Sequence, residues 1–308
     1  MMLSQKDLLG IQMLSADEIR LILDTAETMK HVISASSKKT AHLQGKSVIT
    51  LFYENSTRTR LSFELAAKYM SAASANVSAS SSSVNKGESL IDTARTIDQM
   101  GTDLLIMRHP QSGAPHLIAS RVKASVINAG DGMNEHPTQA LLDLFTMRAR
   151  KGDLAGLQVA IVGDIMHSRV ARSNLWALLK MGAHVRLAAP GTLLPPGLDR
   201  LGASVCPTVA DAVRNADVVM GLRIQLERMQ KALFPSVSEY ARFYALDENI
   251  LRLARKDAIV MHPGPCNHGI EMPTPIYDGD QSVIQEQVTN GVAVRMAIMF
   301  LLTSRRNA

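Results

Sequence analysis

The sequence predicts an α/β protein with two doubly wound domains, each a parallel β-sheet flanked by helices. Three observations predict this architecture. Short apolar segments alternate with amphipathic segments along most of the 308 residues, a pattern typical of parallel strands joined by helices. A polar, glycine-containing break at 151–156 interrupts the alternation, which then starts again. The length also suits about two domains, each with a core of its own.

The first domain is expected to occupy residues 1–150. A capping box at Ser15–Glu18 opens a helix that we expect to continue to about Ile33. Strands are predicted to follow at 47–53, 75–79, 103–107 and 125–129, the first of them an apolar run that predicts a buried strand. Amphipathic periodicity predicts the connecting helices at 58–72, 88–100, 113–121 and 136–150.

The second domain is expected to occupy residues 151–284. It begins with a strong strand pattern at 157–163, followed by a helix at about 168–181. Further strands are predicted at 184–189, 217–221 and 258–261. Apolar periodicity at about 283–302 predicts a last helix, and we expect this C-terminal helix, about 285–308, to pack back on the first domain.

Composition narrows the class of protein. The net charge is +5 and aromatic residues make up only 4%, which argues against a single-stranded nucleic-acid binder and favours an anionic substrate. The absence of a signal-peptide pattern and of a long apolar run predicts no membrane association. Two cysteines, Cys206 and Cys266, fit a reducing, cytoplasmic compartment. The chain has neither Cys-x-x-Cys nor His-Glu-x-x-His, so no metal site is predicted.

The most informative motif is Glu54–Arg60, Glu-Asn-Ser-Thr-Arg-Thr-Arg, between the first predicted strand of the sheet and the helix after it. Its central residues lie at a helix N-terminus, where backbone N–H groups are unpaired and the helix dipole is positive. An N-cap needs one hydroxyl, whereas this motif supplies three hydroxyls and two guanidinium groups. We therefore expect a bound dianion such as phosphate, the alternative being a cap followed by solvated arginines. The candidate ligands are Ser56, Thr57, Arg58 and Thr59.

Further polar residues follow other predicted strands, where open α/β sheets bind their ligands. Gly163 lacks the following glycines of a dinucleotide fingerprint, so the arginines beyond it suit a carboxylate better than a pyrophosphate. For His136, which precedes a proline, a structural turn is the alternative. The candidates are Arg108, His136, Gln139, Arg169, Arg223, Gln225 and the stiff turn His262–Pro265.

Residues 71–83 form a segment rich in alanine and serine that ends in four consecutive serines. Such composition is typical of a flexible surface loop. The alternative interpretation is a mobile loop that delivers Ser82 and Lys86 to an anion.

Taken together, these motifs resemble those of aspartate carbamoyltransferase catalytic chains, within the aspartate/ornithine carbamoyltransferase superfamily. The motifs occur in the family's order and span most of the chain. The matching segments are Phe52–Arg60, Lys86–Ser89, His136–Gln139, Gly163–Asp164 with His167–Arg169, Arg223–Gln225 and His262–Pro265.

The resemblance implies transfer of the carbamoyl group of carbamoyl phosphate to L-aspartate, early in pyrimidine biosynthesis, without a cofactor. Residues 1–150 would bind carbamoyl phosphate and residues 151–284 would bind aspartate. The implied catalytic residues are Arg58, Thr59, Arg108 and His136. The implied carbamoyl-phosphate ligands are these four with Ser56, Thr57, Gln139 and the backbone carbonyls of Gly264 and Pro265. The implied aspartate ligands are Lys86, Arg169, Arg223 and Gln225.

The resemblance also implies an assembly and leaves alternatives. Ser82 and Lys86 would reach in from a neighbouring subunit, so a homotrimer with shared active sites is expected. Regulatory chains or a dihydroorotase-type partner are further candidate partners. Ornithine carbamoyltransferase, or another member of the superfamily, is the main alternative, although Arg169 and Arg223 oppose a cationic side chain. A catalytically idle subunit is a second alternative. Many relatives carry arginine where this chain has His268, so that residue receives no role.

Overall fold

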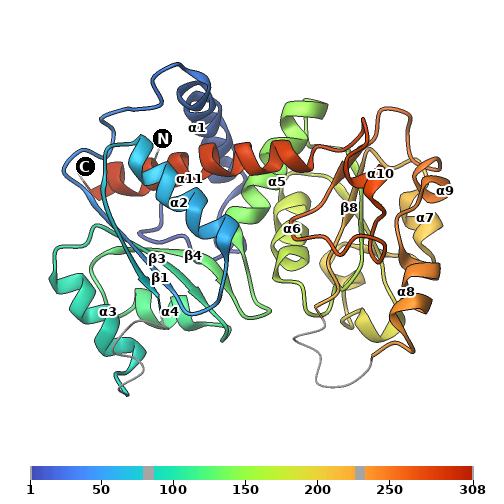
Figure 1. Cartoon of the computed structure of the whole chain (residues 1–308), viewed down its shortest axis with the longest axis horizontal. Helices are drawn as coiled ribbons and strands as arrows, with labels where there is room; N and C mark the ends of the chain where they lie inside the picture. The colour runs from blue at the N-terminus through green and yellow to red at the C-terminus, as the bar shows by residue number, and fades with distance from the viewer. Residues whose placement is uncertain (1, 79–86, 226–232, 307–308) are drawn as a thin grey trace. The chain divides into compact units, whose positions relative to one another are not determined.

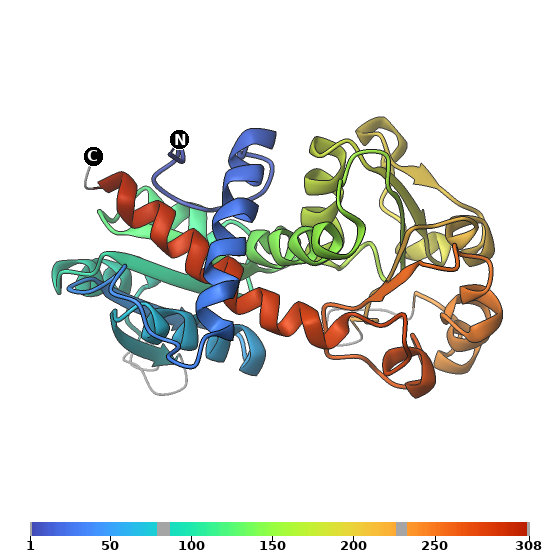
Figure 2. The ribbon, with the colours of Figure 1, turned by 90° about the horizontal axis from the view of Figure 1, so that it is seen from above.

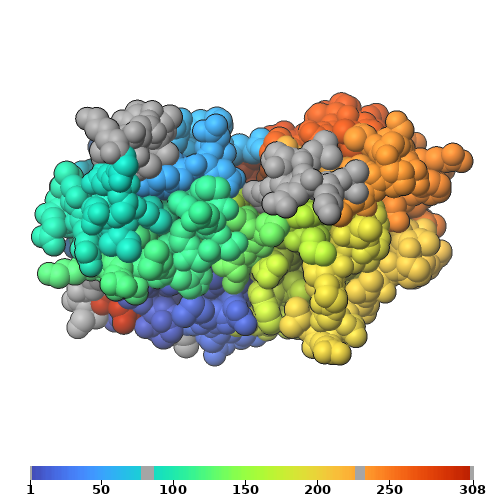
Figure 3. Space-filling view, turned by 90° about the horizontal axis from the view of Figure 1, so that it is seen from below, coloured from blue at the N-terminus to red at the C-terminus, as the bar shows by residue number. Residues whose placement is uncertain are grey.

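The computed structural model describes residues 2–78, 87–225 and 233–306, and the remaining residues are grey in Figures 1 and 3. Ser82 and Lys86 therefore lie outside the described residues. The chain divides into two compact units. Unit 1 comprises Met1–Phe145 with Val288–Ala308, and unit 2 comprises Thr146–Gln287. Each unit contains one parallel sheet flanked by helices, which confirms the predicted fold class.

The sheet of unit 1 has the strand order β2-β1-β3-β4, and all of its pairings are parallel. Its strands are β1 (Ser47–Phe52), β2 (Ala73–Ser78), β3 (Leu104–His109) and β4 (Ser125–Asp131). Its helices are α1 (Ala16–Ser34), α2 (Thr57–Tyr69), α3 (Leu90–Gln99), α4 (Ala114–Ala119) and α5 (Pro137–Lys151), the last of which continues into unit 2. At the β4 edge, Leu8 forms a parallel bridge with Ile127.

The order of the strands in unit 1 creates a switch point between β1 and β3. The chain leaves β1 through α2 to reach β2 on one side, then crosses back through α3 to β3 on the other side. Connections that leave in opposite directions open a crevice at the carboxyl ends of the two strands, and such crevices are the usual ligand sites of open α/β sheets. The Ser-Thr-Arg-Thr-Arg motif follows β1, and Arg108 is the next-to-last residue of β3, so both lie at the carboxyl ends of the switch-point strands.

The sheet of unit 2 has the order β7-β6-β5-β8-β9, again with parallel pairings. Its strands are β5 (Gln158–Val162), β6 (His184–Ala188), β7 (Ser204–Val205), β8 (Val218–Gly221) and β9 (Ile259–Met261). Its helical segments are α6 (Arg169–Lys180), η3 (Gly191–Leu193), η4 (Asp199–Leu201), α7 (Val209–Val213), α8 (Val237–Tyr244), α9 (Glu248–Leu251) and α10 (Thr274–Tyr277). The switch point of this sheet lies between β5 and β8.

The C-terminal helix α11 (Ile284–Arg306) packs on unit 1, as the sequence predicted (Figures 1 and 2). Arg295 of α11 donates a hydrogen bond from Nη1 to Ser62 Oγ on α2, at 2.8 Å. The same guanidinium lies 5.0 Å from the centroid of the Phe63 ring. Farther along the helix, Phe300 contacts the His42 ring edge to face, with the centroids 5.1 Å apart.

Each unit has its own apolar core. In unit 1, residues of β1, β3 and β4 such as Leu51, Leu105 and Val126 pack against the inner faces of α3 and α4. In unit 2, residues of β5 and β8 such as Ala160 and Val219 pack against α7 and the segment before β9. Among the described residues, no helix combines the length and the apolarity needed to cross a membrane.

Candidate active site

The first group of candidate ligands lies at the N-terminus of α2. Ser56 is the N-cap residue and has an extended backbone, with φ −159°. Within the described chain, its side chain makes no hydrogen bond that caps the helix, so the hydroxyl is not used in the way the capping alternative requires. Thr57 and Arg58 are exposed, whereas Thr59 is buried. The arrangement presents hydroxyl, guanidinium and backbone N–H donors at one point.

Two helices, α2 and α6, carry basic residues in their first turns. The first turns of α1, α3, α7, α8 and α9 contain acidic residues, which suit the positive end of the helix dipole. The first turn of α2 is instead Thr57–Arg60, and α6 begins at Arg169. A cation at the positive end of a helix destabilises it unless an anion binds there. Both helices follow the switch-point strands of their sheets, so each sheet has a candidate anion site where open α/β sheets usually bind ligands.

Arg108 lies within β3, whereas the sequence placed it just beyond the strand. The ladder extends because Phe52 and Arg108 pair in the parallel register, and Tyr53 N–H donates to the Arg108 carbonyl at 2.9 Å. The guanidinium of Arg108 donates from Nη2 to Glu54 Oε1 at 2.6 Å, a charge-assisted hydrogen bond. Glu54 thus holds Arg108 beside the Ser-Thr-Arg-Thr-Arg motif in this structure.

A buried turn after β4 delivers His136 and Gln139. The carboxylate of Asp131 is fully buried and accepts hydrogen bonds from Glu135 N–H at 3.1 Å and Asn128 Nδ2 at 2.8 Å, which fixes the turn. His136 precedes α5 and is buried, with its Nδ1 atom 3.4 Å from Thr138 Oγ1. Gln139 lies on the first turn of α5 and donates from Nε2 to Asp143 at 2.9 Å.

A second group of candidate ligands lies in unit 2, where two loops approach each other at the switch point. Gly163 follows β5 and has φ +133°, a conformation that favours glycine. A Cβ atom at this position would lie 2.6 Å from the carbonyl oxygen of Leu222, the residue that follows β8. The absence of a side chain therefore allows the two loops that carry Arg169 and Arg223 to approach each other.

Two buried carboxylates fix the backbone between Arg223 and Gln225. Asp164, fully buried, accepts from Gln225 N–H at 3.2 Å and from His167 N–H at 3.0 Å. Glu271, also buried, accepts from Ile224 N–H at 2.9 Å. Asp164 thereby joins the loop that begins α6 to the loop after β8.

The two arginines of unit 2 differ in their exposure. Arg169 is buried at the first position of α6, after Ser168, whose side chain caps the helix by accepting from Ala171 N–H at 3.1 Å. Arg223 is half-buried and donates from Nη2 to Gln225 Oε1 at 3.4 Å, so the two side chains lie together, as their spacing of two predicted.

The turn after β9 brings backbone carbonyls to the end of the strand. Gly264 has φ +62° and a cis peptide bond to Pro265. The N–H of Gly264 donates to His262 Nδ1 at 2.9 Å, which closes the turn. His268 lies farther along, with its ring against Tyr277 and the centroids 4.8 Å apart, so the structure gives His268 a packing contact.

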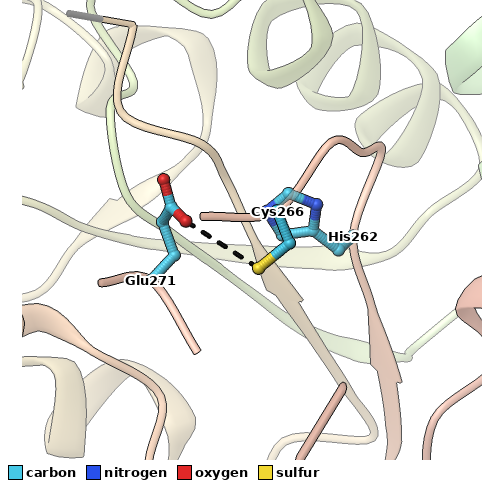
Figure 4. A group of neighbouring side chains, drawn as sticks. All are labelled: His262, Cys266 and Glu271. Carbon is cyan, nitrogen blue, oxygen red and sulfur yellow. Dashed lines mark hydrogen bonds between the residues drawn. The ribbon is translucent and has the colours of Figure 1, made fainter. Parts of the chain in front are cut away.

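His262, Cys266 and Glu271 are the one group of described residues whose ligand atoms approach closely enough for a metal ion, within 4.8 Å of one another (Figure 4). Their existing bonds oppose that use. Nδ1 of His262 already accepts from Gly264, and the Glu271 oxygens accept from Ile224 and Asn267. Burial and the neighbouring Glu271 carboxylate raise the pKa of Cys266 to about 12, and its thiol donates a hydrogen bond to Glu271 Oε2 at 3.8 Å. We therefore interpret the group as part of a hydrogen-bond network.

Sequence reasoning missed the residues that support the ligands. Glu54, Asp143, Asp164 and Glu271 act through hydrogen bonds to the candidate ligands or to their backbone. The sequence contains a pattern that could have identified Asp164, because this residue directly follows a predicted strand that ends in glycine. No sequence pattern identifies Glu271, because its partner Ile224 lies 47 residues away along the chain.

Comparison with known proteins is consistent with this geometry. Residues 6–149 match the model of the aspartate/ornithine carbamoyltransferase carbamoyl-P binding domain, and residues 155–302 match that of the Asp/Orn binding domain. The chain therefore belongs to the aspartate/ornithine carbamoyltransferase family.

Individual relatives extend over nearly the whole chain. The aspartate carbamoyltransferase catalytic subunit of Ruminiclostridium cellulolyticum is 66% identical over 99% of this chain and 97% of its own length. Among solved structures, Trypanosoma cruzi aspartate transcarbamoylase in complex with N-(phosphonacetyl)-L-aspartic acid is similar with a TM-score of 0.88 and 31% identity, over 96% of this chain and 94% of that one. Ornithine carbamoyltransferase from Thermus thermophilus is similar with a TM-score of 0.86 and 26% identity, over 97% of this chain and 99% of that one.

Proposed function

We propose that this chain is the catalytic chain of an aspartate carbamoyltransferase. It transfers the carbamoyl group of carbamoyl phosphate to the amino group of L-aspartate, giving N-carbamoyl-L-aspartate and phosphate, in de novo pyrimidine biosynthesis. The observation that carries this proposal is that cationic residues follow the switch-point strands of both sheets: the Ser-Thr-Arg-Thr-Arg motif in unit 1 and two arginines in unit 2. The identity of 66% to a named catalytic subunit supports the same substrates.

In this proposal, unit 1 binds carbamoyl phosphate, with residues 1–150 as the carbamoyl-phosphate domain. The phosphate is held at the start of α2 by the donors of residues 56–59. Thr59, Arg108 and His136 polarise the carbonyl oxygen of the carbamoyl group. For Arg108 to act on the substrate, its bond to Glu54 must be shared or exchanged. Gln139, assisted by the backbone carbonyls of Gly264 and Pro265, accepts hydrogen bonds from the carbamoyl amide.

Residues 151–284 form the aspartate domain in the same proposal. Arg169 and Arg223 bind the two carboxylates, and Gln225 assists them through its contact with Arg223. The buried carboxylates that hold the neighbouring backbone keep the two guanidinium groups in place, because Asp164 bonds to both loops.

The chemistry needs positioning and charge stabilisation. The aspartate amine attacks the carbamoyl carbon, a C–N bond forms, the C–O bond to phosphate breaks, and the proton that the amine nitrogen loses leaves with the phosphate. Negative charge develops on the carbonyl oxygen and then leaves with phosphate. Fixed cations at both places stabilise the transition state, and each donor contributes roughly 2.7–4 kcal/mol in comparable sites. The residues alone provide these groups, so the proposal includes no cofactor.

The main alternative is ornithine as the acceptor, because an ornithine carbamoyltransferase shares the fold with a TM-score of 0.86. Arg169 and Arg223 favour aspartate, since two cations suit a dicarboxylate and repel the ammonium group of an ornithine side chain.

Carbamoyl transfer by the purified chain, with L-aspartate or L-ornithine as acceptor, tests the proposal. We expect carbamoyl-aspartate as the product. Transfer to ornithine alone would overturn the assignment of Arg169 and Arg223. Inactivity with both acceptors, in a folded preparation, would favour an idle or partner-dependent subunit.

We also propose a cytoplasmic homotrimer in which Ser82 and Lys86 complete the site of a neighbouring subunit, with Lys86 on the aspartate. Regulatory chains or a dihydroorotase-type protein are candidate partners. Subunit exchange tests the shared site: Lys86→Ala trimers and Arg58→Ala trimers are each expected to be inactive, and mixing them should restore part of the activity. Verified exchange without recovery would contradict shared sites.

A further inference from the structure

The amide of Gln139 has its orientation fixed by a buried carboxylate. Gln139 and Asp143 are four residues apart on α5, so their side chains lie on one face of the helix. Gln139 Nε2 donates to Asp143 Oδ1 at 2.9 Å. Asp143 is fully buried, and Gln139 is only 8% exposed. The bond is therefore shielded from water, where it is stronger than at the surface.

The chemistry of Asp143 allows only one orientation of that amide. An ionised carboxylate accepts hydrogen bonds and donates none, so the NH₂ group of Gln139 must face Asp143. The carbonyl oxygen Oε1 of Gln139 must then face the other way, as an acceptor. The two ends of a glutamine amide have almost the same shape, so their hydrogen-bond partners decide the orientation.

A buried arginine from the C-terminal helix supplies a positive charge that acts on Asp143. Arg295 is 4% exposed, and its Nη1 atom is held by Ser62 Oγ at 2.8 Å. Burial lowers the pKa of Arg295 to about 10, and the charge of Asp143 opposes this shift, so Arg295 is cationic at neutral pH. A fixed cation near a buried carboxyl group favours the carboxylate.

We propose that Asp143, supported by Arg295, is a positioning residue that makes the site select a carbamoyl group over an acetyl group. The inference rests on the proposed function, in which Gln139 contacts the carbamoyl amide. With Oε1 directed to the substrate, the site offers an acceptor to the carbamoyl NH₂. The methyl group of acetyl phosphate occupies the same space but cannot donate, so the acceptor stays unpaired when acetyl phosphate binds.

Asp143→Asn tests the proposal because asparagine has the same shape but both accepts and donates. The amide of Gln139 can then turn over, and its NH₂ group can face the substrate. We expect the ratio of kcat/KM for carbamoyl phosphate to that for acetyl phosphate to fall about five- to tenfold, the effect of one neutral hydrogen bond. The value of kcat/KM should decrease for carbamoyl phosphate, whereas that for acetyl phosphate should change by less than about twofold.

The two donors are compared in one preparation with L-aspartate as acceptor, so the ratio does not depend on the fraction of active protein. Where acetyl transfer is too slow to follow, the inhibition constant of acetyl phosphate against carbamoyl phosphate replaces its kcat/KM. The background variant Gln139→Ala provides a second readout. If Asp143 acts through Gln139, adding Asp143→Asn to Gln139→Ala leaves the ratio unchanged.

Two further variants separate positioning from stability. Ser62→Ala removes a buried hydrogen bond of the same cluster but leaves both charges in place, so the donor ratio should match that of the wild type. If Asp143→Asn alone does not fold because Arg295 is left without its carboxylate, the paired variant Asp143→Asn with Arg295→Met removes both buried charges. The paired variant should show the same fall in the ratio.

An unchanged ratio in a folded Asp143→Asn or paired variant, with a wild type that transfers carbamoyl groups to aspartate, would overturn the inference alone. A further fall in the ratio when Asp143→Asn is added to Gln139→Ala would also overturn it, because Asp143 would then act independently of Gln139. A wild type that does not carbamoylate aspartate would overturn the proposed function and this inference with it.

Discussion

The two units hold their candidate ligands in different ways. Unit 1 presents Arg58 on the exposed first turn of a helix, where its neighbours are other candidate donors to an anion. Unit 2 places Arg169 in a buried position, and it holds the backbone beside Arg223 with the carboxylates of Asp164 and Glu271. A compact phosphate can be bound by donors at a helix terminus, whereas an amino acid with two carboxylates needs two cations at a fixed separation. Substitutions should therefore separate activity from stability in unit 1 and couple them in unit 2.

The largest effect expected is in unit 1. Arg58→Ala should lower turnover about 10²- to 10³-fold, since it removes a donor to the group that leaves with negative charge. Because Arg58 is exposed, the free energy of unfolding should change by less than about 0.5 kcal/mol. Steady-state kinetics and thermal unfolding measure the two quantities. Lys68→Ala, an exposed cation in the last turn of the same helix, is the matched control and should retain full activity. Equal losses in the two variants would contradict a specific role for Arg58.

In unit 2, Gly163→Ala should affect stability and aspartate binding together. The new Cβ atom would lie 2.6 Å from the Leu222 carbonyl oxygen, on a backbone with φ +133°. Strain and overpacking should destabilise the protein by roughly 2–4 kcal/mol and raise KM for aspartate. Gly156→Ala is the control, because Gly156 has φ +78° and open space around its Cβ position. It should cost about 1–2 kcal/mol and leave KM unchanged. An unchanged KM for aspartate in Gly163→Ala would separate the loop crossing from ligand binding.

Glu271→Gln should also change stability and aspartate binding together, but by less than Gly163→Ala. In the wild type, the two carboxylate oxygens of Glu271 accept from the backbone N–H groups of Ile224 and Asn267. The amide of glutamine has one accepting oxygen only, so its NH₂ group would face one of these two N–H groups, a donor against a donor. We expect a destabilisation of about 1–3 kcal/mol and a severalfold rise in KM for aspartate, with KM for carbamoyl phosphate little changed. The exposed Glu248 provides the control through Glu248→Gln. A rise in both KM values would indicate a general loss of structure.

The smallest effect expected is on pH dependence. Burial raises the pKa of Glu271 above its ordinary value of 4.5, against the hydrogen bonds that lower it. Because the folded pKa is the higher one, the stability that this group contributes is fully present below pH 4.5 and is lost as pH rises through the folded pKa. The stability advantage of the wild type over Glu271→Gln should therefore narrow above pH 4.5, by about 1.4 kcal/mol for each unit of pKa shift. Thermal unfolding of both proteins across pH 4–8 measures the difference; an advantage that grows with pH would mean that the pKa is lowered.

Local pattern was enough to predict much of the fold. The strands β1, β3, β4 and β5 each carry an apolar run, so they were predicted close to their bounds. The two-residue strand β7 and the short helices α7, α9 and α10 were not predicted, because elements of two to five residues have too few positions to show a period. The extension of β3 to include Arg108 was missed because it depends on pairing with β1 and not on local sequence.

The candidate ligands could be found from the sequence because they follow strands that open α/β sheets use for binding. Their supports could not be found in the same way. Asp143 is an ordinary acidic residue in the middle of a predicted helix, and only the fold brings Arg295 near it, more than 150 residues later. Glu271 gains its role when β8 and the turn after β9 come together.

The two junctions between the units have a consequence for how the protein is made. The chain passes from unit 1 to unit 2 inside α5 and returns inside α11, so unit 2 is one continuous stretch whereas unit 1 needs residues from both ends of the chain. On the ribosome, unit 2 has all of its strands before α11 has emerged. Unit 1 stays incomplete until Arg295 has been synthesised. Until then Asp143 lacks its buried cation and Ser62 lacks its hydrogen-bond donor. The half that is translated first is therefore the half that is completed last.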